Sequence, residues 1–307
     1  MSFAQDVRHY LQLTPRQLPS RYLYDPLGSA LFDAICELPW YGITRAESRL
    51  LATHRSEIFA EMPGLTRIVE LGPGDGRKLL TLVDGVSTRL DAHLIDVSAG
   101  ALARAAHTLS DAPHVNVIAH EASFEDGLEA IAHLPRGGRL LALFLGSNIG
   151  NFDPPASTTL LRRVRASLGR DGALLIGADL VKPEEDLRRA YDDPLGVSAA
   201  FNLNLLLRIN RDLEGDFDLR AFAHRAVWNA ACSRIEMYLV PTSAQRVHID
   251  AIDLDLELAE GEAIWTESAY KYSPEGWKRQ LTEAGFEPLA QWLDRDDGFA
   301  LTLARPA

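Results

Sequence analysis

The sequence contains few cysteines, the residues that could join parts of a fold covalently. Its 307 residues include two cysteines, Cys36 and Cys232, which lie far apart. We expect both to be buried free thiols in a reducing cytoplasm, while the sequence alone leaves a bridge between them open. No cluster of cysteine and histidine has the spacing of a zinc site, so we expect no bound metal.

Long hydrophobic runs and an excess of positive charge are also missing. No apolar stretch approaches the roughly 18 residues of a membrane-spanning helix, and we find no basic-then-apolar pattern of an export signal at the start. Lysine and arginine number 31 against 43 aspartate and glutamate, a net charge of −12. This balance predicts no broad attraction to nucleic acid or to an anionic membrane. We expect a cytoplasmic monomer whose partners are small molecules.

The middle of the chain instead shows a repeated alternation of strand and helix patterns. With 47% hydrophobic residues, the chain can bury a large core and can hold two domains. The alternation is typical of a doubly wound α/β sheet, with parallel strands wrapped by helices. Short apolar runs predict strands over 65–71, 91–96, 115–119, 139–145 and 172–178, and helical patterns lie between them over 77–85, 98–109, 125–133 and 155–169.

The flanking segments follow other patterns. The first 60 residues are mainly helical in pattern, and a helical segment follows Asp179 to about residue 211. A helix opens at Ser273-Pro274 and runs to about 284, because serine is a good cap and proline suits a first turn. Strand patterns occur near 221–230, 233–240, 244–250 and 262–267, and a closing antiparallel hairpin over 287–293 and 298–304 is expected to extend the core sheet.

These patterns predict two domains that are both discontinuous in sequence. Residues 49–181 and 272–307 would form the core domain, and residues 1–48 and 182–271 would form a smaller α+β domain. Open α/β sheets bind ligands at the carboxyl ends of their strands. We therefore expect the smaller domain to cover that edge of the sheet and to bind the substrate.

Three alternating glycines follow the first predicted strand of the core. In IVELGPGDGRK, residues 68–78, they are Gly72, Gly74 and Gly76. Glycines at a strand-to-helix junction permit a tight turn and a close approach of backbone to ligand, so they predict a nucleotide site. Asp96 ends the next predicted strand, where a carboxylate can accept hydrogen bonds from ribose hydroxyls. An exposed turn acid is the alternative for Asp96.

The spacing of these glycines separates two kinds of nucleotide site. A dinucleotide-binding turn has the form G-x-G-x-x-G, whereas here the form is G-x-G-x-G and Arg77 follows it. Glu70 stands two residues before the first glycine. The arrangement E-x-G-x-G-x-G resembles the first motif of class I S-adenosylmethionine-dependent methyltransferases, so it favours methyl transfer over hydride transfer.

Five further stretches resemble the L-histidine Nα-methyltransferase family of ergothioneine biosynthesis. The resemblance spans nearly the whole chain in unbroken order and implies a two-domain enzyme that methylates the histidine α-amine three times, giving the betaine hercynine. The stretches are RYLYDPLGSALFDAICELPWYGITRAE (21–47), FLGSNIGNF (144–152), AYDDPLGVSAAFNLNLL (190–206), RIEMYL (234–239) and TESAYKYSPE (266–275).

The resemblance implies a role for sixteen residues. Lys78 would pair with the carboxylate of the methyl donor, Glu267 would hold the imidazole, and Asn151 and Tyr191 would hold the carboxylate of the amino acid. Tyr24 and Phe32 would surround the reacting amine, with Tyr24 orienting it. The remaining donor-site residues would be Tyr41, Gly72, Gly74, Asp96, Ser123 and Phe124, and the remaining substrate-site residues would be Gly146, Asn148, Met237 and Ala269.

Three positions depart from the family pattern. Ser123 stands where the family usually has an aspartate that contacts adenine, and a serine bonds the adenine amine more weakly than a carboxylate does. Ala269 replaces a serine that helps to bind the imidazole, and Asn148 replaces a threonine of the substrate loop. The lost hydroxyl beside a ring nitrogen would cost about 1–3 kcal/mol. The same methyl transfer to another amino acid or a histidine derivative is therefore the alternative function.

Other interpretations remain open at this level. Without the resemblance, Lys78 would be read as a solvated helix lysine, the aromatic residues as core, and Glu267 as a solvated acid at a strand end. A nicotinamide-dependent oxidoreductase is disfavoured by the glycine spacing. A binding module without catalysis is suggested only by Ser123.

Overall fold

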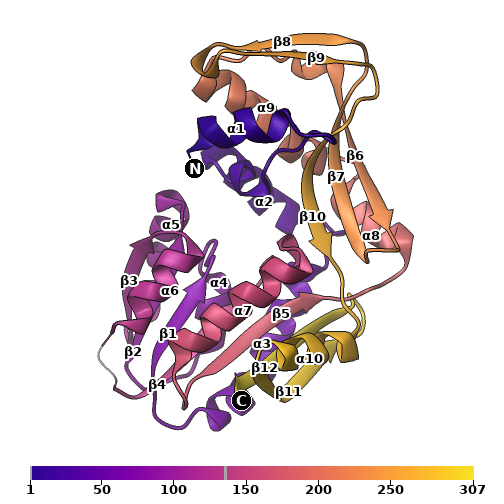
Figure 1. Cartoon of the computed structure of the whole chain (residues 1–307). Coiled ribbons are helices and arrows are strands. Elements are labelled where there is room, and N and C mark those ends of the chain that lie inside the picture. Colours follow the sequence, from indigo (N-terminus) through magenta and orange to yellow (C-terminus); the bar gives the residue numbers. More distant parts are fainter. Residues whose placement is uncertain (1, 135–136) are drawn as a thin grey trace. The chain divides into compact units, whose positions relative to one another are not determined.

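The computed structural model describes residues 2–134 and 137–307. The chain divides into two compact units, which we describe separately. The core unit consists of Ile43–Val181 and Lys271–Ala307, and the insert unit consists of Met1–Gly42 and Lys182–Tyr270. The first division falls at the start of helix α3 (Ile43–Glu61), so the whole helix stays in the core unit. Both units are labelled by element in Figure 1.

The core unit is built on a seven-stranded sheet in the order β11-β12-β5-β4-β1-β2-β3. Strands β1 to β5 pair in parallel, and β12 pairs antiparallel with both β5 and β11. The predicted α/β class and the closing hairpin at the sheet edge are confirmed. The strands are β1 (Leu65–Leu71), β2 (Leu90–Asp96), β3 (Val115–Glu121), β4 (Arg139–Phe144), β5 (Ala173–Asp179), β11 (Phe286–Asp294) and β12 (Phe299–Pro306).

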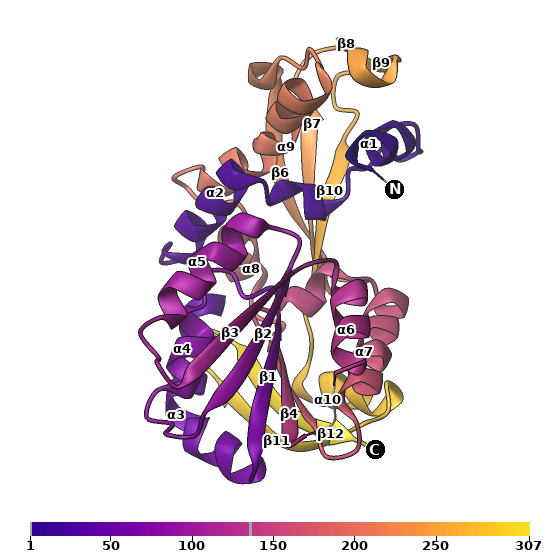
Figure 2. The same ribbon diagram turned by 90° about the vertical axis from the view of Figure 1, so that its left-hand side faces the viewer.

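Helices cover both faces of this sheet, as Figure 2 shows. The group α3, α4 and α5 lies on one face, and the group α6, α7 and α10 lies on the other. Serine or aspartate caps four of these helices, which explains why they begin where the sequence predicts. Their bounds are α4 (Arg77–Val83), α5 (Ala99–Leu109), α6 (Phe124–Ala132), α7 (Pro154–Leu168) and α10 (Pro274–Glu283).

The insert unit contains helices and two small antiparallel sheets. The three-stranded sheet has the order β10-β7-β6, and the two-stranded sheet pairs β8 with β9. Its helices are α1 (Phe3–Leu11), the 3₁₀ helix η1 (Ser20–Leu23), α2 (Pro26–Cys36), α8 (Glu184–Tyr191) and α9 (Val197–Leu213). Its strands are β6 (Phe222–Asn229), β7 (Arg234–Pro241), β8 (Gln245–Ile249), β9 (Leu254–Leu258) and β10 (Ile264–Tyr270).

Two sequence predictions about the insert unit were wrong. The single helical segment from 179 to 211 is two helices, because the turn Asp192–Gly196 breaks it. A proline at 194 removes a backbone donor, and Gly196 has φ of 75°. Strand β9 was missed, although its sequence LDLEL alternates apolar and acidic residues and its burial alternates with them.

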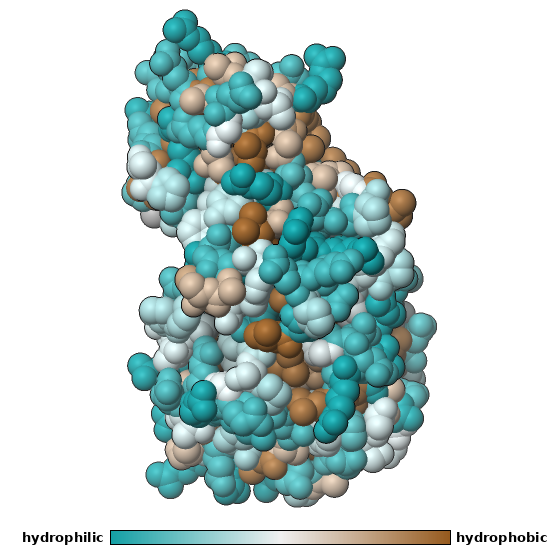
Figure 3. Space-filling view, turned by 90° about the vertical axis from the view of Figure 1, so that its right-hand side faces the viewer, coloured by the Kyte–Doolittle hydropathy of each residue, from teal (hydrophilic) through white to brown (hydrophobic). Residues whose placement is uncertain are grey.

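The helices and the surface of the described residues agree with what the composition predicts. Within the described residues, no helix is both long enough and apolar enough to cross a membrane. Hydrophilic residues predominate on the face in Figure 3, where hydrophobic residues form small groups. Neither Cys36 nor Cys232 forms a disulfide, as expected. The expectation that both thiols are buried was wrong, because Cys36 is only partly buried and Cys232 is exposed.

A pair of histidines bridges strands β2 and β3 of the core unit. Nδ1 of His93 lies 2.9 Å from Nε2 of His120, and the two rings are stacked with centroids 5.2 Å apart. Only one of these two nitrogens can carry a proton in that contact. Burial, and then the neighbouring charge of His120, lowers the pKa of His93 below its ordinary value of 6.5. Burial also lowers the pKa of His120.

We expect this pair to make the core unit sensitive to acid. Below about pH 6.5 the unfolded chain takes up protons that the folded histidines resist, so the free energy of unfolding falls as the pH falls. Denaturant unfolding of the His120→Gln variant should show a smaller loss between pH 7 and pH 5.5 than the wild type. His107→Gln, at an exposed helical site, is the control. An equal loss in His120→Gln and wild type would contradict this account.

Candidate functional site

The predicted glycine turn follows β1 and needs glycine at two positions for different reasons. Gly72 and Gly76 have φ of 69° and 80°, which disfavours other residues. A Cβ at Gly76 would lie 2.9 Å from Cα of Ala105, so this glycine permits the close contact of α4 with α5. A Cβ at Gly72 would lie 3.1 Å from Nδ2 of Asn148 and 3.5 Å from the ring of Phe124. Gly72 therefore keeps space open between two predicted site residues.

Replacing Gly72 by alanine should weaken binding of the ligand at this turn by about tenfold or more, because the methyl group adds crowding to backbone strain. Isothermal titration calorimetry with S-adenosylhomocysteine measures the effect. Gly85→Ala is the matched control, since Gly85 has φ of 79° and no atom within 4 Å of the added Cβ. A Gly72→Ala variant that binds as tightly as Gly85→Ala would show that the turn does not approach the ligand.

Lys78, in the first turn of α4, makes a short ion pair with Glu47 of α3. Nζ of Lys78 lies 2.6 Å from Oε2 of Glu47, whose side chain is fully buried. The same oxygen accepts a hydrogen bond from the N–H of Gly146 at 2.7 Å. Gly177 of β5 leaves the space that the carboxylate occupies, because a Cβ there would lie 1.9 Å from Oε1 of Glu47. Glu47 thus connects the glycine-turn helix with the loop after β4.

A second buried acid lies close to Lys78. Burial raises the pKa of Glu70 to about 8; the charge of Lys78 opposes this rise, while Glu47 and Asp75 add to it. The raised pKa favours the protonated form of Glu70. Its Oε2 is buried and has no hydrogen-bond partner among the described residues. An unsatisfied buried carboxyl oxygen beside a glycine turn is a polar atom to which a bound ligand can form a hydrogen bond.

Asp96 lies where the sequence predicts, at the carboxyl end of β2. Its Oδ1 accepts the N–H of Ser98 at 2.8 Å. Burial raises the pKa of Asp96, while the N–H of Ser98, the charge of Arg104 and the N–H of Val97 oppose this rise. The adjacent strand end is close, because the N–H of Gly72 donates to the carbonyl of Ile95 at 2.9 Å.

Ser123 is the N-cap of α6. Its Oγ accepts the N–H of Asp126 at 3.1 Å and lies 2.7 Å from Oδ2 of the same residue, to which it donates. Phe124 contacts Phe144 edge-to-face, with centroids 5.5 Å apart, and also faces Gly72. The hydroxyl of Ser123 is therefore held within its own helix turn, with one acceptor position remaining.

The loop after β4 carries three predicted substrate residues, Gly146, Asn148 and Asn151, and is strained. Gly146 and Ser147 have φ of 75° and 57°. Ser147 is held there because its Oγ accepts the N–H of Asp179 at 2.9 Å. Asn148 and Asn151 begin and end the short helix η2 (Asn148–Asn151). A non-glycine residue with such a φ is characteristic of functional loops.

In the core unit, the structure thus brings together Gly72, Lys78, Phe124, Gly146 and Asn148. Atoms of Lys78 and Asn148 lie 3.2 Å and 3.7 Å from a Cβ added at Gly146. All candidates of this unit lie at the carboxyl ends of β1, β2, β3 and β4 or in the turns that follow them. That edge is where open α/β sheets bind ligands.

In the insert unit, the four predicted aromatic residues form a continuous row. Ring centroids are 5.5 Å apart for Tyr24 and Phe32, 6.1 Å for Phe32 and Tyr41, and 6.2 Å for Tyr41 and Tyr191. Phe201 of α9, which is buried, contacts both Tyr24 and Phe32. Such a row offers π faces and edges to a ligand with an organic cation.

Two buried aspartates fix the helices that carry these rings. Asp25 caps α2: its Oδ1 accepts the N–H of Gly28 and the Nδ2 of Asn204, each at 2.7 Å. Asp193 caps the turn before α9, where the N–H of Ser198 donates to it at 2.7 Å. Burial alone would raise the pKa of Asp193, but hydrogen bonds, led by that from Ser198, lower it. Tyr24 and Tyr191 each lie one or two residues before these caps.

Met237, Glu267 and Ala269 lie on two paired strands. Glu267 of β10 is the register partner of Met237 of β7, and the register shifts between Trp265 and Glu267. Such an irregularity re-aims a side chain, and here it is held because Nε1 of Trp265 donates to the carbonyl of Glu267 at 2.8 Å. Ala269, two residues on, shares the face of Glu267. All three predicted residues are buried.

The N-terminal segment brings Tyr24 towards β10. Residue Gln17 forms a parallel bridge with Trp265, and the N–H of Leu18 donates to the carbonyl of Trp265 at 2.8 Å. Helix η1, which ends directly before Tyr24, also contacts β10. The aromatic row and the strand that carries Glu267 are thereby neighbours within the insert unit.

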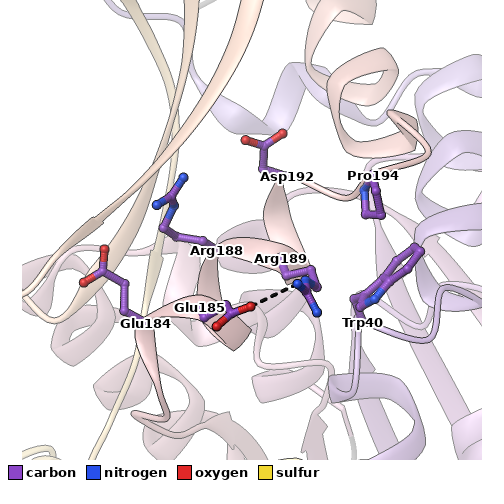
Figure 4. A pocket seen from close by; sticks show the side chains of 7 residues that line it. All are labelled: Trp40, Glu184, Glu185, Arg188, Arg189, Asp192 and Pro194. Atoms are coloured by element: carbon purple, nitrogen blue, oxygen red, sulfur yellow. Dashed lines mark hydrogen bonds and ion pairs between the residues drawn. The ribbon is translucent and has the colours of Figure 1, made fainter.

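The insert unit also has an open cavity of about 760 Å³, shown in Figure 4. Trp40 and Pro194 form one side, and charged residues of α8, among them Arg188 and Arg189, form the other. None of the predicted site residues lines it, but Trp40 precedes Tyr41 in the sequence. In the described part of the chain, no group of three or more histidine, cysteine, aspartate or glutamate side chains could hold a metal ion.

Sequence reasoning missed several residues that the structure places at these sites. Glu47 lies at the end of the first quoted stretch and Phe201 within the third, so the resemblance contained a signal for both. Ser147 also lies in a quoted stretch, the second. Trp265 directly precedes the fifth stretch, and no sequence pattern marks its bond to Glu267.

The comparisons of the sequence with a family model and with a curated relative agree on one family. The sequence model described as histidine-specific methyltransferase, SAM-dependent, matches residues 3–306. Histidine N-alpha-methyltransferase of Mycolicibacterium smegmatis is 41% identical over 98% of this chain and 94% of its own length. Ergothioneine biosynthesis protein 1 of Neurospora crassa is 29% identical over 91% of this chain and 32% of its own length. The solved magnesium protoporphyrin IX methyltransferase of Synechocystis, with 10% identity, covers 94% of this chain and 98% of its own with a TM-score of 0.49.

Proposed function

The chain belongs to the S-adenosylmethionine-dependent, histidine-specific methyltransferases, and we propose that it methylates the α-amine of L-histidine up to three times, giving hercynine. The observation that carries this proposal is the match of the family over residues 3–306. The core unit would bind the methyl donor. The insert unit carries most of the residues that we assign to the amino acid. Gly146, Asn148 and Asn151, which we also assign to the amino acid, belong to the core unit.

The residues of the core unit fit S-adenosylmethionine. Gly72 keeps an open space beside Phe124, and the buried Oε2 of Glu70 has no partner among the described residues. We assign Lys78 to the donor carboxylate, Asp96 to the ribose hydroxyls, and Phe124 to the adenine face. Gly74 completes the turn, and Ser123 bonds the adenine amine with its remaining acceptor position. Tyr41, which belongs to the insert unit, is assigned to the methyl donor as well.

The residues of the insert unit fit histidine and its methylated products. Glu267 accepts an N–H of the imidazole and sets the ring orientation, over a surface made by Met237 and Ala269. Tyr191 donates to the carboxylate of the amino acid, a role that we also assign to Asn151, which belongs to the core unit. Tyr24 and Phe32 surround the α-nitrogen, where cation–π attraction of about 0.5–2 kcal/mol stabilises the growing methylammonium. Phe201 supports both rings from α9.

The reaction is an in-line displacement at carbon. S-adenosylmethionine supplies a methyl group on a sulfonium, so the C–S bond breaks as the amine nitrogen forms the new N–C bond. The amine must first be neutral, and Tyr24 orients its lone pair while a proton is lost to water. The protein contributes mainly by alignment, which can supply several kcal/mol.

The departures at Asn148 and Ala269 support one alternative, methyl transfer to another amino acid. A panel of L-histidine, its Nα-methylated forms, histidine analogues and tryptophan separates the two functions, with release of S-adenosylhomocysteine as the readout. We expect the highest kcat/KM with histidine or its methylated forms. A higher kcat/KM with another amino acid would replace histidine as the acceptor. We further propose that the enzyme acts in the cytoplasm as a monomer on small molecules alone.

A further inference from the structure

A partly buried histidine of the insert unit holds the residue that we assign to the substrate carboxylate. Nε2 of His224, on β6, lies 2.8 Å from the backbone carbonyl oxygen of Tyr191. A carbonyl can only accept, so Nε2 carries the proton. Tyr191 is the last residue of α8, where carbonyl groups lack partners within the helix. His224 therefore caps the end of the helix that presents Tyr191.

The other ring nitrogen of His224 is fixed as an acceptor. Nδ2 of Asn202, on α9, lies 3.0 Å from Nδ1 of His224 and donates to the carbonyl of Tyr238 at 3.1 Å. Because the carbonyl of Tyr238 can only accept, it sets which end of the Asn202 amide faces His224. Nδ1 of His224 consequently accepts, and the imidazole is neutral.

The orientation of the Asn202 amide destabilises the fold, which argues that the orientation has a functional role. Asn202 is fully buried, and its Oδ1 has no hydrogen-bond partner among the described residues. A rotated amide would give Oδ1 a partner only if His224 carried a second proton, and it would lose the bond to Tyr238. Buried polar groups without partners are rare in folded proteins.

We propose that His224 is a positioning residue for the amino-acid substrate, which acts by holding the Tyr191 backbone through the fixed series Tyr238, Asn202, His224 and Tyr191. The inference rests on the proposed function, because it needs Tyr191 to bind the substrate carboxylate. The ring of Tyr191 is next to that of Tyr41. A displaced α8 terminus would therefore disturb the aromatic row as well.

Protonation of His224 would break the series, since Nδ1–H would face the amide hydrogens of Asn202. Burial lowers the pKa of His224, while the carbonyl of Tyr191 and the charges of Asp192 and Asp193 oppose this. The groups that face the ring from α9 and β7 are the Asn202 amide and the Tyr238 carbonyl, both uncharged. Acid should therefore weaken histidine binding more than donor binding.

Two variants of the full chain test this role. His224→Gln keeps an N–H donor for Tyr191 but does not titrate, whereas His224→Leu removes the donor. We expect His224→Leu to raise KM for histidine about tenfold, a loss of about 1.4 kcal/mol, with an unchanged calorimetric Kd for S-adenosylhomocysteine. His224→Gln should stay near the wild-type KM at pH 7.5. Between pH 7.5 and pH 5.5 the KM of His224→Gln should rise less than that of the wild type. Protonation of the substrate affects both proteins equally, so the difference between them reports protonation of His224.

The outcomes separate the inference from the proposed function. If the wild type methylates histidine but His224→Leu keeps its KM, the positioning role is refuted and the function stands. Equal losses of histidine and donor binding in His224→Leu would indicate a structural role only and would also refute it. If the wild type methylates no amino acid, the proposed function fails and this inference fails with it.

Discussion

Replacing Glu267 by alanine should raise KM for histidine by about 10- to 150-fold, because a hydrogen bond to a charged group contributes about 1.5–3 kcal/mol. The carboxylate is buried on β10, where the irregular register opposite Met237 and the bond from Trp265 fix its position. The donor is assigned to the core unit. The Kd for S-adenosylmethionine should therefore change by less than about twofold.

Steady-state kinetics with varied histidine measure KM. Calorimetry with S-adenosylhomocysteine, the product of the donor, measures affinity at the donor site. Glu257→Ala is the matched control, since Glu257 is a strand glutamate whose side chain is 79% exposed. Equal weakening of both ligands would contradict the role of Glu267 in holding the imidazole. An unchanged KM would contradict it as well, and would favour an acceptor other than histidine.

The second large effect is expected at Lys78. Lys78→Met should weaken binding of the donor about 10- to 100-fold, because a charged partner of its carboxylate is lost. It should also lower the free energy of unfolding by about 3–5 kcal/mol, since the fully buried Glu47 is left without its cation. Calorimetry and denaturant unfolding measure the two losses separately.

The double variant Lys78→Met/Glu47→Gln separates binding from folding. A glutamine at 47 is neutral and its amide oxygen can still accept the N–H of Gly146, so most of the lost stability should return. Donor affinity should remain low. Lys278→Met, at an exposed position of α10, is the control for removal of a lysine. A double variant that binds the donor like the wild type would show that Lys78 supports the fold and not the ligand.

The core of the fold could be predicted because its signals are local. The run at 65–71 is a strand in the sheet, and the glycines after it form the predicted tight turn with positive φ. The break of the predicted helix after Tyr191 was missed, although an Asp-Pro sequence and a glycine mark it. Local signals were present there too, but the helical patterns on both sides outweighed them.

Contacts between distant residues could not be predicted from pattern. Glu47 reaches Lys78 and Gly146 only because α3 packs on the sheet and Gly177 leaves room for the carboxylate. The bond between His224 and Tyr191 likewise depends on the packing of α8 against β6. The resemblance named most of the candidate residues, but the interactions that hold them in place appear only in the folded chain.

The central claim is that the α-nitrogen of histidine receives the methyl group. Its most direct test is to incubate the wild type with S-adenosylmethionine and L-histidine and to analyse the product by mass spectrometry and NMR. We predict products with one to three added methyl groups, all on the α-nitrogen, with both imidazole nitrogens unchanged. Unmodified histidine, or a methyl group on the ring, would contradict the account.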